Sequence, residues 1–296
     1  IYVWFEAVIG YLSASIEWAK GTEDWKEWWY GENAQHYYFM GKDNLIFHTL
    51  FWPGQLFGYD NKIHLPDFPA INNFLNLEGQ KFSKSRGIII DSEYIGKAYG
   101  VDAVRFYLTY IMPENSDANF AWQDFADFNN NILIGKFGNF INRVLKLAAE
   151  VSTSDLFEKD AAVQKRVSDA ILKSHTYLST CEFKLYAQEV IGLAAFGNEY
   201  VASNEPWKKE KSGEEYKKII LNSLYIVLAL LVLMKPLIPT SAEKLEKMLG
   251  ISIKTWDDPL ALLKNITIQN PEILFKKIEP EMVVAEKRKL MGQGKG

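Results

Sequence analysis

The chain has 296 residues, of which 48% are hydrophobic and 24% charged, so it can bury a sizeable core and is not a disordered chain. Its one cysteine, Cys181, excludes a disulfide scaffold and any cysteine-rich zinc site within these residues. The net charge of −4 argues against a protein that coats nucleic acid through a uniformly positive surface, while local basic patches stay possible.

The first 115 residues predict an α/β layer. Aromatic residues and short strand-like runs alternate there with Gly, Pro and Asn, which are typical of turns. The expected strands are Ile1–Val8, Tyr37–Met40 and Phe74–Leu77. This part is too short to be a complete nucleotide-binding fold by itself.

Residues 116–296 predict an all-α domain. An apolar stripe between Leu133 and Ala148 recurs at helical spacing, and further helices are expected over about 160–203, 213–235 and 240–249. The chain is therefore expected to divide into domains 1–115 and 116–296.

Two details refine the helical part. The apolar run Leu224–Met234 is too short to span a bilayer, which needs roughly 20 apolar residues, so it predicts a buried helix in a bundle. Thr240 and Glu243 have the spacing of a capping box, in which Glu243 would accept a hydrogen bond from the Thr240 amide.

The stretch Lys81–Gly87 reads KFSKSRG and is the most informative part of the sequence. Three cations and two hydroxyls in seven residues can wrap a polyphosphate, and a lysine can stabilise the charge that develops on a leaving pyrophosphate. By composition alone such a loop is more often an exposed basic turn. Its order, however, resembles the KMSKS signature (residues 81–85) of class I aminoacyl-tRNA synthetases, with Phe82 in place of Met. This resemblance implies catalytic roles for the following residues: Lys81, Ser83, Lys84 and Ser85.

Other segments resemble one member of that class, the methionyl-tRNA synthetases. Tyr2–Tyr11 is similar to the family segment YVWFDAPIGY, and Phe39–His48 to FxGKDNxxFH. Asp24–Trp29 is similar to the archaeal and eukaryotic-type branch. Similarity continues from Asn204–Trp207 to about Pro239, so it covers most of the chain.

The resemblance implies a methionine pocket and a contact with the adenylate. Aromatic rings suit a thioether, and without the motif the pocket aromatics would be ordinary core residues. Val8 stands where the family has Pro and Glu6 where it has Asp, which puts the detailed shape of the pocket in question. The implied methionine-binding residues are Trp4, Ala7, Tyr11 and His48, and the ATP- or adenylate-binding residues are Gly41, Lys42, Asp43 and Lys84.

The helical part carries a polar face that could read RNA. On an ideal helix Lys136, Asn139, Arg143 and Lys146 lie within about 80° of one another and away from the apolar stripe. Taken alone, this pattern is typical of a solvated helix face. The resemblance implies that Asn139 and Arg143 contact a CAU anticodon, and that Pro206 and Trp207 form a second element in which the tryptophan stacks on a base.

A class I synthetase also needs an HxGH motif, and none of the four histidines (His36, His48, His64 and His175) lies in one. The resemblance therefore implies the C-terminal part of a methionyl-tRNA synthetase: the second half of a Rossmann-type catalytic domain, then a helical-bundle anticodon-binding domain. The structural zinc is expected only in an N-terminal part, and no appended dimerisation domain is seen.

The implied activity is ATP-dependent attachment of methionine to tRNA(Met) in the cytoplasm, with Mg²⁺ and without a membrane. This chain alone is not expected to activate methionine. Two alternatives stay open: an anticodon-binding module without catalysis, and another class I synthetase, which would share the loop but not the match at Trp4–Tyr11. The oligomeric state cannot be read from the sequence.

Overall fold

The computed structural model describes residues 3–149, 151–152, 158–256, 258–269 and 271–293. They form two compact units that do not follow chain order. The first unit is residues 1–75 with 113–118, and the second is residues 76–112 with 119–296.

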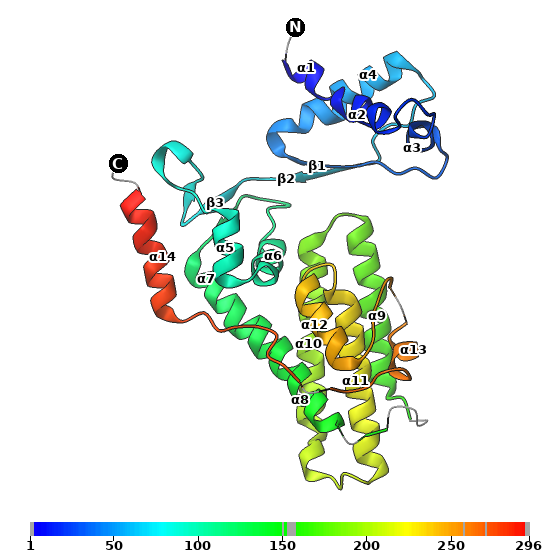
Figure 1. Ribbon diagram of the computed structural model, residues 1–296, viewed down its shortest axis with the longest axis vertical. Coiled ribbons are helices and arrows are strands. Elements are labelled where there is room, and N and C mark those ends of the chain that lie inside the picture. Colours follow the sequence, from blue (N-terminus) through cyan, green and yellow to red (C-terminus); the bar gives the residue numbers. More distant parts are fainter. Residues whose placement is uncertain (1–2, 150, 153–157, 257, 270, 294–296) are drawn as a thin grey trace. The chain divides into compact units, whose positions relative to one another are not determined.

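The first unit is built on a βαβ arrangement. β1 (Tyr37–Gly41) pairs in parallel with β2 (Phe68–Asn72), and Figure 1 shows the two strands side by side. Parallel strands need a long crossover, which here is helical. It runs through a 3₁₀ turn, a π-helical turn and α4, which are Lys42–Asn44, Phe47–Phe51 and Trp52–Tyr59. The other helices of this unit are α1 (Val3–Ala7), α2 (Gly10–Trp18) and α3 (Trp25–Tyr30).

Tryptophans hold the first unit together. Trp52 is 1% exposed, its indole Nε1 donates to the Tyr38 hydroxyl at 2.9 Å, and the ring of Trp29 packs edge-on against it. These contacts join α3 and α4 to β1. The prediction of a strand at Tyr37–Met40 is confirmed by β1.

The expected strand Ile1–Val8 is wrong, because Val3–Ala7 is the helix α1; Ile1 and Tyr2 lie outside the described residues. Aromatic and β-branched residues favour strands only where a pleated neighbour packs on them. Within Val3–Val8 only Val8 is buried, and the backbone instead makes local bonds, such as the amide of Ile9 to the carbonyl of Glu6 at 3.1 Å.

The second unit begins with a small sheet and three helices. β3 (Leu75–Leu77) lies between β4 (Gln80–Lys81) and β5 (Ala118–Phe120), so the strand predicted at Phe74–Leu77 is confirmed within one residue. The chain passes between the two units three times: within β3, between Met112 and Pro113, and at the start of β5. The helices that follow the sheet are α5 (Ser92–Tyr99), α6 (Val101–Tyr110) and α7 (Trp122–Asp127).

The rest of the second unit is a helical bundle around α11 (Glu214–Met234). Every side chain of α11 from Ile219 to Met234 is buried, which confirms the predicted bundle helix. By length and composition α11 could cross a membrane, but 89% of its apolar window is covered by the protein. Around it lie α8 (Asn139–Ala148), α9 (Ala161–Ser179), α10 (Phe183–Asn204), α12 (Pro239–Leu249) and α13 (Pro259–Leu263). A π-helical segment (Phe128–Gly138) leads into α8, and α14 (Pro280–Gln293) packs against α7.

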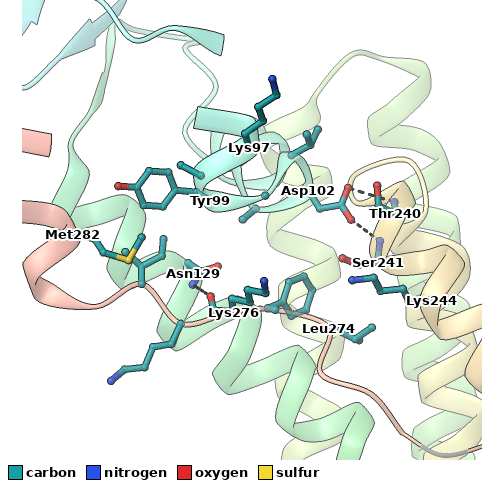
Figure 2. A pocket seen from close by; sticks show the side chains of 17 residues that line it. Lys97, Tyr99, Asp102, Asn129, Thr240, Ser241, Lys244, Leu274, Lys276 and Met282 are labelled. Carbon is teal, nitrogen blue, oxygen red and sulfur yellow. Dashed lines mark hydrogen bonds between the residues drawn. The ribbon is translucent and has the colours of Figure 1, made fainter. Parts of the chain in front are cut away.

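Two helical expectations need correction. The helix expected over 160–203 is two helices, α9 and α10, separated at Cys181, whose φ of 59° cannot continue a right-handed helix. The capping box is not formed. The amides of Thr240 and Ser241 donate instead to the carboxylate of Asp102 on α6, at 3.4 and 2.5 Å, as Figure 2 shows.

A glycine sets how closely α8 approaches α10. A Cβ at Gly197 would lie 2.5 Å from Cζ of Phe140, a fully buried ring. We expect Gly197→Ala to lower the free energy of unfolding by about 1–3 kcal/mol, the usual cost of overpacking. Urea unfolding measures this. Gly192→Ala on the same helix is the control, because its Cβ would meet only the end of the Arg166 side chain at 3.1 Å; equal stability of both variants would contradict the packing argument.

Candidate functional site

The phosphate-binding candidate is a short loop in the second unit. Ser83 and Ile88 close it with two backbone hydrogen bonds of 2.9 Å, and Lys84–Arg86 form a 3₁₀ turn between them. Gly87 ends the turn with a φ of 67°, a conformation that glycine adopts without strain. The Ser83 and Ser85 hydroxyls lie 3.2 Å apart.

The loop exposes its cations. Lys81, Lys84 and Arg86 are all exposed, and neither Lys84 nor Arg86 has an ion-pair partner among the residues that the structure describes. An unpaired ammonium on a short turn can approach a phosphate without first breaking an internal ion pair. This geometry suits the predicted role of the loop, whose residues lie together as the sequence suggested.

The methionine-binding candidates lie in the first unit, where Tyr11 contacts His48. The Tyr11 hydroxyl is 2.9 Å from Nε2 of His48, and His48 Nδ1 is 2.9 Å from the carbonyl of Asn44. Because a carbonyl only accepts, the neutral imidazole carries its proton on Nδ1, and Tyr11 donates to Nε2. His48 is 8% exposed, whereas Tyr11 is 44% exposed and offers its ring to a ligand.

The other two candidates of this pocket lie on α1. Trp4 is 48% exposed and stacks on Phe47, the neighbour of His48, with ring centroids 5.7 Å apart. Ala7 is exposed one turn further along the same helix. Of the two departures from the family pattern, Val8 packs in the core and Glu6 is exposed.

The adenylate-binding candidates follow β1 directly. Gly41 ends the strand, and Lys42 and Asp43 start the 3₁₀ turn after it, at the carboxyl end of a parallel strand where ligands of α/β folds bind. Asp43 is exposed. Lys42 is engaged within the protein: its Nζ pairs with Asp117 at 2.8 Å and lies 4.3 Å from the centre of the Phe74 ring.

The anticodon-binding candidates lie on α8 and on the connection between α10 and α11. Asn139 is exposed, and Arg143, one turn later, is half-buried. Lys136 belongs to the π-helical segment, so the 100° spacing assumed for residues 136–146 holds only from Asn139 onward. Between the candidates, Asn142 has a buried side-chain oxygen without a hydrogen-bond partner in the described part of the chain, a feature that the sequence did not signal.

Trp207 lies in a 3₁₀ turn (Pro206–Lys208) and is 53% exposed, whereas Pro206 is buried. The lysines that follow Trp207 are paired within the protein: Lys208 pairs with Glu205 at 2.8 Å and Lys209 with Glu215 at 2.7 Å. Exposed pairs are worth about 1 kcal/mol or less, so a phosphate could still displace these carboxylates.

The sequence did not point to a basic cavity of about 300 Å³ between α6, α12 and residues 274–282 (Figure 2). The only carboxylate among its described lining residues is Asp102, which two backbone amides already satisfy. Such a cavity can accept an anionic group. Its cations come from segments far apart in the sequence and are Lys97, Lys244, Lys276 and Lys277.

In the described part of the chain, no group of three or more His, Cys, Asp or Glu side chains is arranged to hold a metal ion.

Two family models match nearly the whole chain. Residues 1–145 match the model described as tRNA synthetases class I (M), and residues 152–295 match the anticodon binding domain of methionyl tRNA ligase.

Individual relatives agree with these matches. The chain is 40% identical over 266 residues to a methionine–tRNA ligase of Roseiflexus sp. and 36% identical over 277 residues to that of Thermobifida fusca. The two alignments cover 85% and 86% of this chain but 45% and 46% of the relatives, so the chain spans about half the length of the curated relatives it matches. These relatives are bacterial, so they do not support the archaeal and eukaryotic-type branch suggested by Asp24–Trp29.

A solved structure shows the same fold. Mycobacterium tuberculosis methionyl-tRNA synthetase bound by methionyl-adenylate superposes with a TM-score of 0.77 at 22% identity, over 93% of this chain and 56% of that chain. The expected fold class, a mixed α/β catalytic part followed by a helical anticodon-binding part, is confirmed by this likeness and by the two family matches.

Proposed function

Since the chain belongs to the class I methionyl-tRNA synthetase family, we propose that the protein attaches methionine to tRNA(Met) in an ATP-dependent reaction. Residues 1–115 supply part of the catalytic domain, and residues 116–296 supply the anticodon-binding domain. The oligomeric state does not enter this proposal. Charging of tRNA places the protein in the cytoplasm.

One observation supports the catalytic part above the others: the loop is exposed, and its cations Lys84 and Arg86 have no ion-pair partner in the part of the chain that the structure describes. In the first step the methionine carboxylate oxygen bonds to the α-phosphorus of ATP, and the bond to pyrophosphate breaks. Lys84, assisted by Lys81, stabilises the negative charge that gathers on the leaving pyrophosphate. Ser83 and Ser85 can donate hydrogen bonds to the same phosphates.

In the second step a hydroxyl of the tRNA 3′-terminal adenosine bonds to the carbonyl carbon of the adenylate, and AMP leaves. Positioning and electrostatics carry both steps, so no general base is assigned. Mg²⁺ enters with ATP as part of the substrate.

Methionine is recognised by Trp4, Ala7, Tyr11 and His48, and its adenylate by Gly41, Lys42 and Asp43. The thioether packs against the exposed faces of Trp4 and Tyr11, because sulfur makes favourable contacts with aromatic rings. Buried His48 accepts a hydrogen bond from the hydroxyl of Tyr11 and so orients that ring.

The proposed binding of the tRNA anticodon is supported by the exposed side chain of Trp207 and by the polar face of α8. A base of the CAU anticodon stacks on Trp207, which Pro206 anchors, while Asn139 and Arg143 contact base edges or phosphates. Stacking on an aromatic side chain contributes about 1–3 kcal/mol per base.

A test uses this chain and a CAU anticodon stem-loop, with binding followed by quenching of tryptophan fluorescence. We expect Trp207→Ala to weaken binding by roughly 5- to 150-fold, the equivalent of one stacked base. A stem-loop with a changed anticodon should bind more weakly to the wild-type protein. Trp256→Ala, which removes a 37% exposed tryptophan elsewhere in the unit, is the matched control.

The alternatives predict other outcomes. Equal, salt-sensitive binding of both stem-loops would mean phosphate contact alone and would count against the anticodon assignment. The alternative of a binding module without catalysis is favoured by one observation, the lack of an HxGH motif in these 296 residues. For this reason we expect no methionine-dependent ATP–pyrophosphate exchange by the chain alone.

A further inference from the structure

The phosphate loop is tied to α14, although nearly 200 residues separate them in the sequence. Glu286 on α14 is 5% exposed, and its Oε1 accepts hydrogen bonds from the hydroxyls of Tyr94 and Tyr99 on α5. The bond from Tyr99 is 2.9 Å long, as is a third bond from Lys289 Nζ. Lys289 also donates to the Tyr94 hydroxyl, and its Nζ lies 4.4 Å from the centre of that ring.

The tyrosines belong to the helix that leaves the loop. Only residues 89–91 separate the closing bridge of the loop from α5, and Asp91 caps that helix by accepting from the Tyr94 amide at 2.7 Å. By bonding to Tyr94 and Tyr99, the carboxylate of Glu286 therefore also fixes the segment through which the chain leaves the loop, residues 89–91. This segment and the one through which the chain enters the loop, residues 78–81, are called its two stems.

The other stem of the loop also meets α14. Lys287 Nζ lies 3.9 Å from the carboxylate of Glu78, in the turn that leads into β4 and the loop. Glu78 has a φ of 48°, and its other carboxylate oxygen accepts from the Trp122 amide at 2.8 Å. Figure 1 shows α14 alongside α7, the helix that begins at Trp122. Both stems thus contact one helix.

The carboxylate of Glu286 is charged at neutral pH. Burial alone would raise its pKa, but hydrogen bonds from Tyr94, Lys289 and Tyr99 outweigh burial and hold the pKa below its usual value. Burial, followed by the bond to Glu286, raises the pKa of Tyr99 well above its usual value, so this phenol keeps the proton that it donates. Hydrogen bonds to a buried charged group are among the strong ones in proteins.

The segment before α14 is bonded to the helix that leads into α8. Asn130 donates to the carbonyl of Ile278 at 2.8 Å and accepts from its amide at 3.0 Å, and Asn129 donates to the carbonyl of Lys276 at 2.9 Å. Hydrogen bonds, together with the ion pair between Lys287 and Glu78, therefore link the helical segment that leads into α8, through residues 276–278 and α14, to both stems of the phosphate loop.

We propose that Glu286 is a positioning residue, which holds α14 against α5 and thereby keeps the phosphate loop in the conformation that receives pyrophosphate. The part of this inference that concerns pyrophosphate rests on the proposed function. Glu286 acts through Tyr94 and Tyr99 and does not itself touch the substrate.

The first experiment measures opening of the loop in this chain without any ligand. Hydrogen exchange of the Ser83 and Ile88 amides and trypsin cleavage after Lys81, Lys84 and Arg86 report how often the loop opens. We expect Glu286→Ala to raise both rates roughly tenfold or more, since losing hydrogen bonds to a charged group shifts a local equilibrium at least that far. Glu286→Gln keeps an acceptor oxygen, so its exchange and cleavage rates should lie between those of the wild type and those of Glu286→Ala.

Controls separate loop positioning from general destabilisation. Glu281→Ala changes an exposed carboxylate in the first turn of the same helix and should leave loop exchange unchanged. Exchange of the buried α11 amides reports global unfolding and should respond much less than the loop to Glu286→Ala. If Glu286→Ala does not fold, Tyr99→Phe serves instead, because it removes one donor and keeps the ring. The proposal would be overturned if a folded Glu286 or Tyr99 variant exchanged its loop amides at the wild-type rate. It would also be overturned if the exchange rate of the α11 amides rose as much as that of the loop amides.

The second experiment adds inorganic pyrophosphate and measures protection of the loop from trypsin. We expect Glu286→Ala to need a several-fold higher concentration for half-protection, and Glu281→Ala to match the wild type. Unchanged half-protection in Glu286→Ala would overturn the inference. If pyrophosphate fails to protect even the wild-type loop, the proposed function of the loop is wrong, while the ligand-free exchange still decides the role of Glu286.

Discussion

Under the proposed function, replacing Lys84 with alanine is expected to lower methionine-dependent ATP–pyrophosphate exchange by the full-length protein by about 10²-fold or more, the usual cost of removing one group that stabilises transition-state charge. The Lys84 ammonium is exposed and has no ion-pair partner among the described residues, so the substitution removes no internal contact of that kind. The loss should appear mainly in kcat, because the charge on pyrophosphate develops only as the bond breaks.

Lys165→Ala is the matched control for this result. Lys165 is an exposed lysine on α9, and it pairs with Asp169 at 2.8 Å. We expect the ATP–pyrophosphate exchange rate of this control variant to stay close to that of the wild type. If Lys84→Ala kept activity within about threefold of the wild type, Lys84 would have no important part in the transition state.

The largest effect on stability is expected at Asp102. Its side chain is 6% exposed, and its carboxylate accepts from the amides of Thr240 and Ser241 at the start of α12. Asp102→Ala would leave two amides at a helix N-terminus without these acceptors, so we expect the free energy of unfolding to fall by about 2–4 kcal/mol. Urea unfolding with an unchanged m-value would measure this.

Two variants sharpen the interpretation of that measurement. Asp102→Asn keeps one acceptor oxygen and should lose less stability than Asp102→Ala. Asp124→Ala removes an exposed aspartate from α7 and should change the free energy of unfolding by about 0.5 kcal/mol or less. A loss at Asp102 no larger than the loss at Asp124 would show that the two hydrogen bonds contribute nothing.

Local patterns predicted the helical part well. The apolar composition of Leu224–Met234 indicated a buried bundle helix, and α11 has that place. Helical periodicity depends on neighbours three and four residues apart, which a sequence displays directly. The same holds for the phosphate loop, in which two serines, two lysines and an arginine lie within six residues, from the end of β4 to the 3₁₀ turn.

Contacts between distant segments could not be predicted. Glu243 had the spacing to cap α12, but Asp102, far away in the sequence, accepts those amides instead. In the same way Lys42 is held by Asp117. A hydrogen-bond donor takes whichever acceptor the fold brings nearest, and spacing along the chain does not reveal that acceptor.

The sequence by itself determined the family, the loop and the principal helices of the bundle, because each depends on residues that are close together in the chain. Only the tertiary structure decided that Val3–Ala7 is helical, that Lys208 and Lys209 are already paired, and that Glu286 ties α14 to the phosphate loop. These features depend on which side chains are buried against one another, and burial and charge pairing are properties of the folded chain as a whole.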